Sequence, residues 1–247
     1  MTTPLVLLHA FPLHASTYDR LRPLLAVDVI TPDLPGFGSA PMPRGTPRLA
    51  AYAEAVLAEL DAAGLPRVIL GGTSMGGYVA MELLRLSPER VAGLALLDTK
   101  ASADPPAARA NRERIAAAAE SAGLAVVHAD VEPALVGEST KRDRADVVAE
   151  VHAMVAAANP MAVAWAQRAM AARPDSLADL AGFNGPALVL RGDEDALAAE
   201  ADALAMSDAL ADVERVTVRG AGHLAAVENP AAVAAALAGL IARCQNP

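Results

Sequence analysis

Six short and almost continuously apolar runs limit the fold of this chain more than any other feature. They are rich in valine, leucine and isoleucine, and they cover residues 5–8, 27–31, 67–70, 93–97, 187–190 and 214–218. Strands that are buried on both faces of a parallel sheet have this pattern. Segments of helical composition at residues 50–63, 75–86 and 230–243 lie between or after the runs. The alternation predicts an α/β fold with a mainly parallel sheet of about six strands, flanked by helices.

The alternation stops over residues 101–183, where almost the whole stretch has helix-forming composition. Residues 111–121, 143–158 and 161–172 are the candidate helices, and glycine or Asn-Pro breaks separate them. A helical block between two strands predicts a subdomain above the strand ends, where α/β sites form. We therefore expect a core of residues 1–100 and 184–247, with residues 101–183 inserted as a helical cap.

The strongest local signal is a Gly-Thr-Ser-Met-Gly sequence centred on Ser74. It follows the apolar run 67–70 and opens the helix expected at residues 75–86, which is the strand–turn–helix context of a nucleophile elbow. The sharp turn exposes the serine at a helix N-terminus, where backbone N–H groups favour a developing negative charge. We predict Ser74 as a nucleophile; a glycine-rich turn with an incidental serine is the alternative.

A serine nucleophile needs a base, and His223 is the candidate. It ends a Gly-Ala-Gly-His sequence directly after the run 214–218, so it can reach over the end of a strand. A loop histidine without a role is the alternative.

The acid that orients this histidine should follow the preceding apolar run, 187–190. Three carboxylates stand there, and we favour Asp195, with Asp193 hydrogen-bonding the turn instead. Asp98, at the end of the run 93–97, is a further option. Ser74, Asp195 and His223 then occur in the order expected of this kind of site.

An oxyanion hole requires two converging N–H groups. The residue after the nucleophile, Met75, supplies one, and the loop after the first strand supplies the other, most plausibly from Phe11. His9 in the same loop is expected to be structural and to hold the loop in place.

Together these segments resemble the α/β-hydrolase superfamily, and most closely the small bacterial hydrolases that include 3-oxoadipate enol-lactonases and carboxylesterases. The resemblance covers residues 4–100 and 184–243, through LLHAFPLH, TPDLPGFG, GGTSMGGYVAMELL, PERVAGLALLDT, GDED and GAGHLAAVENP. It implies hydrolysis of an ester or lactone through an acyl-enzyme on Ser74, with His223 as base and Asp195 supporting the imidazolium. It implies no metal or organic cofactor.

Two departures from the family pattern stand out. Members usually carry His-Gly where this chain has His9-Ala10, which reduces the backbone freedom of the oxyanion loop. Larger members also have two antiparallel strands before the first run found here. Their absence would leave residues 27–31 at a sheet edge or covered by a partner subunit.

The family places a lid where the predicted cap lies, and lids shape the substrate pocket. Trp165 and Met170 are candidate pocket residues on one cap helix, although packing between cap helices is the alternative for Trp165. His128 and His152, also in the cap, are expected to be surface or helix-packing residues.

Charge and cysteine content narrow the partners and the location. The net charge of −9 disfavours nucleic acid and membrane surfaces. The single cysteine, Cys244, and the absence of a signal-peptide pattern at Met1 predict a cytoplasmic protein. We expect a small ester or lactone substrate and a monomer or homodimer.

The residues leave several functions open. A carbon–carbon bond hydrolase, a thioesterase or a perhydrolase would use the same triad. A small-molecule sensor or signalling protein that keeps the triad belongs to a different class, and a structural protein with a relict triad is a third reading. A serine in the nucleophile position argues against dehalogenases and epoxide hydrolases, which use aspartate there.

Overall fold

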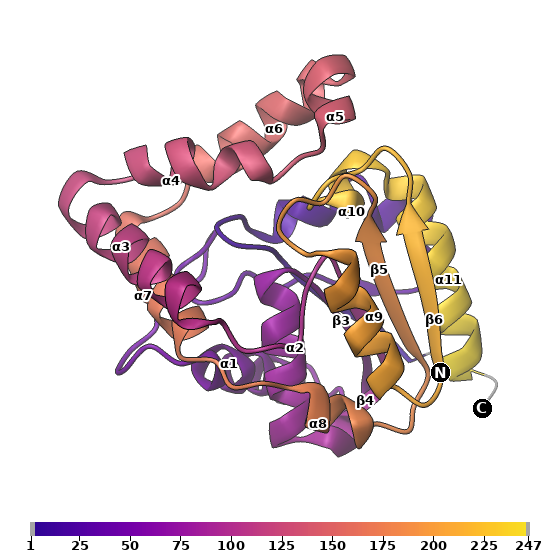
Figure 1. The fold of residues 1–247 in the computed structure, drawn as a ribbon. Helices are drawn as coiled ribbons and strands as arrows, with labels where there is room; N and C mark the ends of the chain where they lie inside the picture. Colours follow the sequence, from indigo (N-terminus) through magenta and orange to yellow (C-terminus); the bar gives the residue numbers. More distant parts are fainter. Residues whose placement is uncertain (1–2, 246–247) are drawn as a thin grey trace.

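Six parallel strands form a single sheet in the order β2-β1-β3-β4-β5-β6 (Figure 1). The computed structural model describes residues 3–245, so Met1, where we saw no signal peptide, lies outside the described residues. The strands are β1 (Leu5–Leu8), β2 (Val29–Ile30), β3 (Val68–Thr73), β4 (Val91–Leu97), β5 (Ala187–Gly192) and β6 (Val213–Val218). The predicted parallel α/β sheet is confirmed.

The strand bounds differ from the prediction mainly at β2 and at the carboxyl ends of β3 and β5. β2 keeps two of the five expected residues, and it lies at the sheet edge, as expected for residues 27–31. β3 continues through Gly71 and Gly72 to Thr73, and β5 continues to Gly192. Glycine has low strand propensity, which is why the sequence pattern ended these strands too early.

Helices cover both faces of the sheet because the strand side chains alternate between two apolar clusters. Val6 and Leu8 of β1 belong to one cluster, and Leu5 and Leu7 belong to the other. The first cluster includes residues of α1 (Leu49–Ala62), α2 (Met75–Leu86) and α9 (Glu200–Ala209). The second includes residues of α10 (Ala225–Glu228) and α11 (Pro230–Gln245). The sheet is therefore the middle layer of three.

The chain from residue 101 to residue 183 is helical, as the composition predicted, and we keep the name cap for it. Its helices are α3 (Pro106–Ala122), α4 (Ala125–Asp130), α5 (Glu138–Asp143), α6 (Ala145–Ala156), α7 (Pro160–Ala171) and α8 (Leu177–Ala181), and a 3-10 turn, η4 (Glu132–Ala134), follows α4. In Figure 1, α4, α5 and α6 lie beyond the ends toward which the arrows of β5 and β6 point, whereas α8 lies beside α2 at the opposite end. The long helices α3 and α7 pack against each other.

Within residues 3–245, no single helix combines the length and apolar composition needed to cross a membrane. The pair α6 and α7, bent by 94° relative to each other, meets those two criteria only when taken together.

Candidate active site

Ser74 occupies the sharp turn between β3 and α2, where its backbone is strained. Its φ of 54° lies in the left-handed region that non-glycine residues avoid. The turn is held from both sides, because the N–H of Ser74 donates to the carbonyl of Leu97 at 3.0 Å and Thr99 Oγ1 donates to the carbonyl of Ser74 at 2.8 Å. The strain thus accompanies a fixed position for the side chain at the start of a helix.

The glycine at position 76 allows this turn to form against the sheet. A Cβ on Gly76 would collide with the carbonyl of Leu8 in β1, so any larger residue would push α2 away from the strand. The G-x-S-x-G spacing therefore reflects a steric requirement of this strand–turn–helix unit.

His223 and Asp195 form a buried hydrogen-bonded pair. His223 Nδ1 lies 2.9 Å from Asp195 Oδ1 and 3.0 Å from Asp195 Oδ2, and the two residues are 4% and 7% exposed. Asp195 Oδ1 also accepts the N–H groups of Leu197 at 2.8 Å and Ala198 at 3.1 Å. Because the carboxylate engages Nδ1, the Nε2 atom of His223 is the one left to act on a reacting group.

The charge of Asp195 is maintained by its partners. Burial acts to raise the pKa of this carboxyl, but the hydrogen bond and charge of His223 and the two backbone N–H groups outweigh it and hold the pKa below its usual value. Asp195 is therefore ionised at neutral pH and can stabilise a positive charge on His223.

The other acidic candidates make different contacts. Asp193 Oδ1 accepts the N–H of Gly220 at 2.8 Å, in the turn-bonding role expected for it, and Glu194 binds Ser139 in the cap. Asp98 is fully buried and accepts the N–H groups of Gly192 at 2.8 Å and Ala225 at 3.2 Å. Burial, followed by the nearby charge of Asp195, raises the pKa of Asp98 well above its usual value. Of the four carboxylates considered, Asp195 is thus the one that contacts His223.

The backbone N–H groups of Phe11 and Met75, predicted to form the oxyanion hole, are placed near the turn. Met75 is the first residue of α2, and Phe11 lines the same cavity as Ser74. Among residues 3–245, neither N–H donates a hydrogen bond within the chain. Both donors thus remain available for an oxygen atom of a ligand.

His9 fits the structural role expected of it in the oxyanion loop. Its Nε2 accepts the N–H of Leu34 at 2.9 Å, and its Nδ1 lies 3.0 Å from the carbonyl of Ala10. Complete burial lowers the pKa of His9 to about 4. The ring therefore stays neutral and joins the loop after β1 to the segment after β2.

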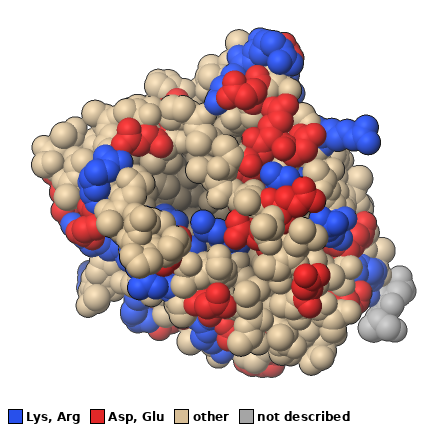
Figure 2. All heavy atoms as spheres, in the orientation of Figure 1, with Lys and Arg blue, Asp and Glu red and all other residues tan. Residues whose placement is uncertain are grey.

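Ser74 and His223 line one cavity of about 210 Å³ between the core and the cap, here called the Ser74 cavity. Figure 2 shows a hollow on this side of the molecule with Lys and Arg side chains along its lower edge. Its apolar lining includes Phe11, Met170 and Leu135. Further lining residues, which the sequence did not indicate, are Tyr78, Lys100, Asp104, Ala108, Asn111, Arg112, Ile115, Asp130, Val131, Gln167, Leu197 and Ala198.

A buried charge cluster lies at the cap side of this cavity. Asp104, only 2% exposed, is paired with Arg112 and, at 2.8 Å, with Arg173. Burial acts to raise the pKa of Asp104, but the two arginines lower it below its usual value. Lys100 Nζ lies 3.9 Å from Asp104 Oδ1, beyond hydrogen-bonding distance. Two arginines thus already satisfy Asp104, and the Lys100 charge is left facing the cavity.

Trp165 does not line the Ser74 cavity, so its predicted role as a pocket residue is wrong. Its ring packs edge-on against Tyr52 of α1, with 4.9 Å between ring centroids, and its Nε1 donates to the carbonyl of Gly45 at 3.4 Å. The side chain points from α7 toward α1, so it packs between cap and core, whereas the alternative considered above was packing between cap helices. Met170, one turn further along α7, does line the cavity.

Comparisons with known proteins agree with this architecture. The sequence model described as the alpha/beta hydrolase family matches residues 5–236. The chain is 41% identical to the pimeloyl-[acyl-carrier protein] methyl ester esterase of Aromatoleum aromaticum over 97 residues. This aligned segment covers 38% of this chain and 36% of the esterase. The chain thus spans about a third of the length of this curated relative.

Solved structures match over nearly the whole chain. A thermophilic esterase from Thermogutta terrifontis, with malate bound, superposes with a TM-score of 0.95 at 35% identity and covers 98% of this chain and 90% of its own. The enol-lactonase from Burkholderia xenovorans LB400 gives a TM-score of 0.90 at 22% identity, over 98% of this chain and 92% of its own. At that identity the second match supports the fold alone.

Proposed function

Because this chain belongs to the alpha/beta hydrolase family, we propose that it is a serine hydrolase that cleaves small carboxylic esters or lactones through an acyl-enzyme. The observation that carries the proposal is that one cavity is lined both by a serine on a strained turn and by a histidine held by a buried carboxylate. The two esterases among the similar proteins support an ester as the substrate class.

The proposed reaction follows from the available atoms. Ser74 Oγ attacks the carbonyl carbon, and His223 Nε2 accepts its proton while Asp195 stabilises the resulting imidazolium. The N–H groups of Phe11 and Met75 donate to the developing oxyanion. His223 then returns the proton to the leaving alkoxide, and a water molecule releases the acyl group from Ser74 by the same steps in reverse.

The test is hydrolysis of p-nitrophenyl esters from acetate to octanoate by the wild-type chain and by Ser74→Ala. Loss of the nucleophile should lower kcat by roughly 10⁴- to 10⁶-fold. Ser121→Ala is the matched control, because its hydroxyl is exposed on α3 and donates only within its own helix. Labelling by a fluorophosphonate should disappear in Ser74→Ala and persist in Ser121→Ala.

Equal and near-background rates in the wild type and Ser74→Ala would contradict a general esterase. If the wild type still reacted with the fluorophosphonate although it did not cleave these esters, a hydrolase with a narrower substrate range would be favoured. Tight binding of a small ligand without turnover would favour the sensor.

We also propose a cytoplasmic monomer or homodimer. Cys244 supports this placement, because a single cysteine cannot form an internal disulfide, which is compatible with a reducing compartment. Light scattering on the purified chain distinguishes the two assembly states.

A further inference from the structure

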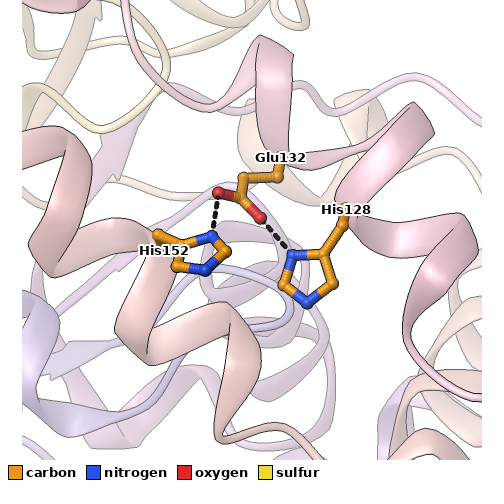
Figure 3. Close-up of side chains that lie close together, drawn as sticks. All are labelled: His128, Glu132 and His152. Carbon is orange, nitrogen blue, oxygen red and sulfur yellow. Dashed lines mark hydrogen bonds and ion pairs between the residues drawn. The ribbon is translucent and has the colours of Figure 1, made fainter.

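Two histidines and a glutamate from separate segments of the cap come together away from the Ser74 cavity. His128 lies on α4, Glu132 begins the turn η4, and His152 lies on α6 (Figure 3). We expected both histidines to be surface or packing residues, and 24 positions separate them along the chain. The fold instead directs both rings at a single carboxylate.

The distances between these groups suit a shared ion. Glu132 Oε1 lies 2.8 Å from His152 Nδ1, Glu132 Oε2 lies 2.5 Å from His128 Nδ1, and the ring centroids are 5.1 Å apart. One ligand atom from each residue lies within 4.8 Å of the others. Metal–nitrogen and metal–oxygen bonds of about 2.0–2.2 Å place the ligands of tetrahedral zinc roughly 3.4 Å apart. Side-chain rotations are therefore enough to close the group around one ion.

We propose that His128, Glu132 and His152 bind one divalent transition-metal ion of the zinc class. Two imidazoles and one carboxylate form a donor set that such ions prefer, and magnesium and calcium prefer oxygen ligands alone. The side chain of His152 is 61% exposed, so solvent can reach the ion and a water molecule can complete its coordination.

The charges around the group permit a cation. Lys141 lines the neighbouring cavity, together with His128 and Glu132, but its Nζ is paired with Glu138 at 2.6 Å. Arg114 of α3 is paired at 2.6 Å with Asp130, the last residue of α4. Both nearby cations are thus compensated by carboxylates outside the group, and the charge of Glu132 remains for the metal.

The position of the site gives the ion a structural consequence. Residues 128–136 separate two cavities: Asp130, Val131 and Leu135 face the Ser74 cavity, whereas His128 and Glu132 face the second one. An ion bound here ties this wall of the Ser74 cavity to α6. It fixes the pocket from behind and takes no part in bond cleavage, so the binding site does not depend on the proposed function.

The experiment is calorimetric titration of the full chain with zinc chloride, after removal of any polyhistidine tag and prior treatment with a chelator. We expect one ion per chain, and affinity at least about tenfold weaker in His152→Ala and in Glu132→Gln. His152→Ala keeps the fold because the side chain is exposed. Glu113→Gln, at an exposed α3 carboxylate that pairs with Arg168 of α7 and has no place in the group, is the matched control and should bind like the wild type.

A second readout follows the ligands directly. Cobalt(II) bound to the wild type should give a visible absorption spectrum of low-coordinate geometry that His152→Ala lacks, and zinc should raise the Tm of the wild type more than that of His152→Ala. The proposal is overturned if zinc shows no saturable binding, or if His152→Ala and Glu132→Gln bind it as tightly as the wild type. Inactivity of the enzyme toward esters would leave either result unchanged.

Discussion

The loops at the carboxyl ends of β3 to β6 and the cap above them are held together by different forces. In the loops, buried backbone and carboxylate groups satisfy one another, as at Ser74 and at Asp195 with His223. On the outer surface of the cap, half-exposed ion pairs join neighbouring helices, as Arg168 of α7 joins Glu113 and Glu120 of α3. The first arrangement tolerates little displacement, whereas the second can be rearranged at small cost.

The buried side chain of Glu228 forms hydrogen bonds to both regions. It is 4% exposed, and its carboxylate accepts the N–H groups of Gly222 at 2.9 Å and Leu224 at 3.2 Å, on either side of His223. The same carboxylate accepts Gly137 N–H at 2.8 Å and Thr140 Oγ1 at 2.6 Å from the cap. One side chain thus positions the histidine loop and attaches the cap to it. The comparison indicates that the loops hold the proposed catalytic residues in place, while the cap contributes side chains to the cavity around them.

After Ser74→Ala, the largest effect is expected within the loops, from Asp195→Asn. An amide in this place favours the tautomer of His223 in which Nε2 carries the proton, so kcat for an ester should fall by about 10⁴-fold. Asp193→Asn, a carboxylate two positions away that bonds only the Gly220 turn, is the control and should retain most activity. Equal losses in the two variants would show that Asp195 has no special part in the reaction.

The next largest effect is expected from the loss of the Glu228 carboxylate. Glu228→Leu leaves four buried donors without their acceptor, and it should lower the free energy of unfolding by about 2–5 kcal/mol. Urea denaturation measures this loss. Glu138→Gln removes an exposed cap carboxylate and should change the free energy by less than about 0.5 kcal/mol. A similar, small loss in both variants would mean that core and cap are attached elsewhere.

A smaller effect is expected at Lys100, in the loop after β4 that faces the Ser74 cavity. Lys100→Met removes the cavity cation that has no hydrogen-bonded partner among the described residues. An ester that carries a carboxylate on its acyl chain should show a KM raised roughly three- to tenfold, from a Coulomb energy of about 1 kcal/mol. The KM for p-nitrophenyl butyrate, which is neutral, should stay the same. Equal changes for both esters would indicate a change of cavity shape in place of lost charge.

The smallest effect is expected from the exposed ion pairs of the cap. Arg168→Ala breaks the contacts of α7 with Glu113 and Glu120, but it should cost less than about 1 kcal/mol of unfolding free energy, since water screens these charges. The difference from the wild type should shrink further in high salt. A loss as large as that of Glu228→Leu would remove the distinction between the two regions.

The sequence predicted the core well because its signals are local. α2 begins and ends at the predicted residues, and β1 matches the predicted range, since each combines an apolar pattern with clear end signals. The predicted helix at residues 111–121 starts five residues too late, because Pro106 was not recognised as the first residue of α3. The short helices α4, α5 and α8 and the helix α9 were not assigned. Helices of five or six residues, such as α4, α5 and α8, leave too few periodic positions for a pattern.

The candidate site was predictable in one half only. Ser74, Asp195 and His223 each follow an apolar run within a short distance, and a parallel sheet brings such loops to one edge. Arg112 and Gln167 follow no such rule, because they lie on α3 and α7 and face the cavity only through the packing of these two helices. For the same reason the sequence could not distinguish Met170, which reaches the cavity, from Trp165, which packs on Tyr52.

By itself, therefore, the sequence determined the order of strands and helices and the residues at the strand ends, because alternation, glycine spacing and chain order are properties of neighbouring positions. Only the tertiary structure decided which cap side chains face Ser74, how Glu228 joins the cap to the histidine loop, and that His128 and His152 meet at Glu132. These contacts depend on the angles at which helices pack, and those angles are set by side chains far apart in the chain.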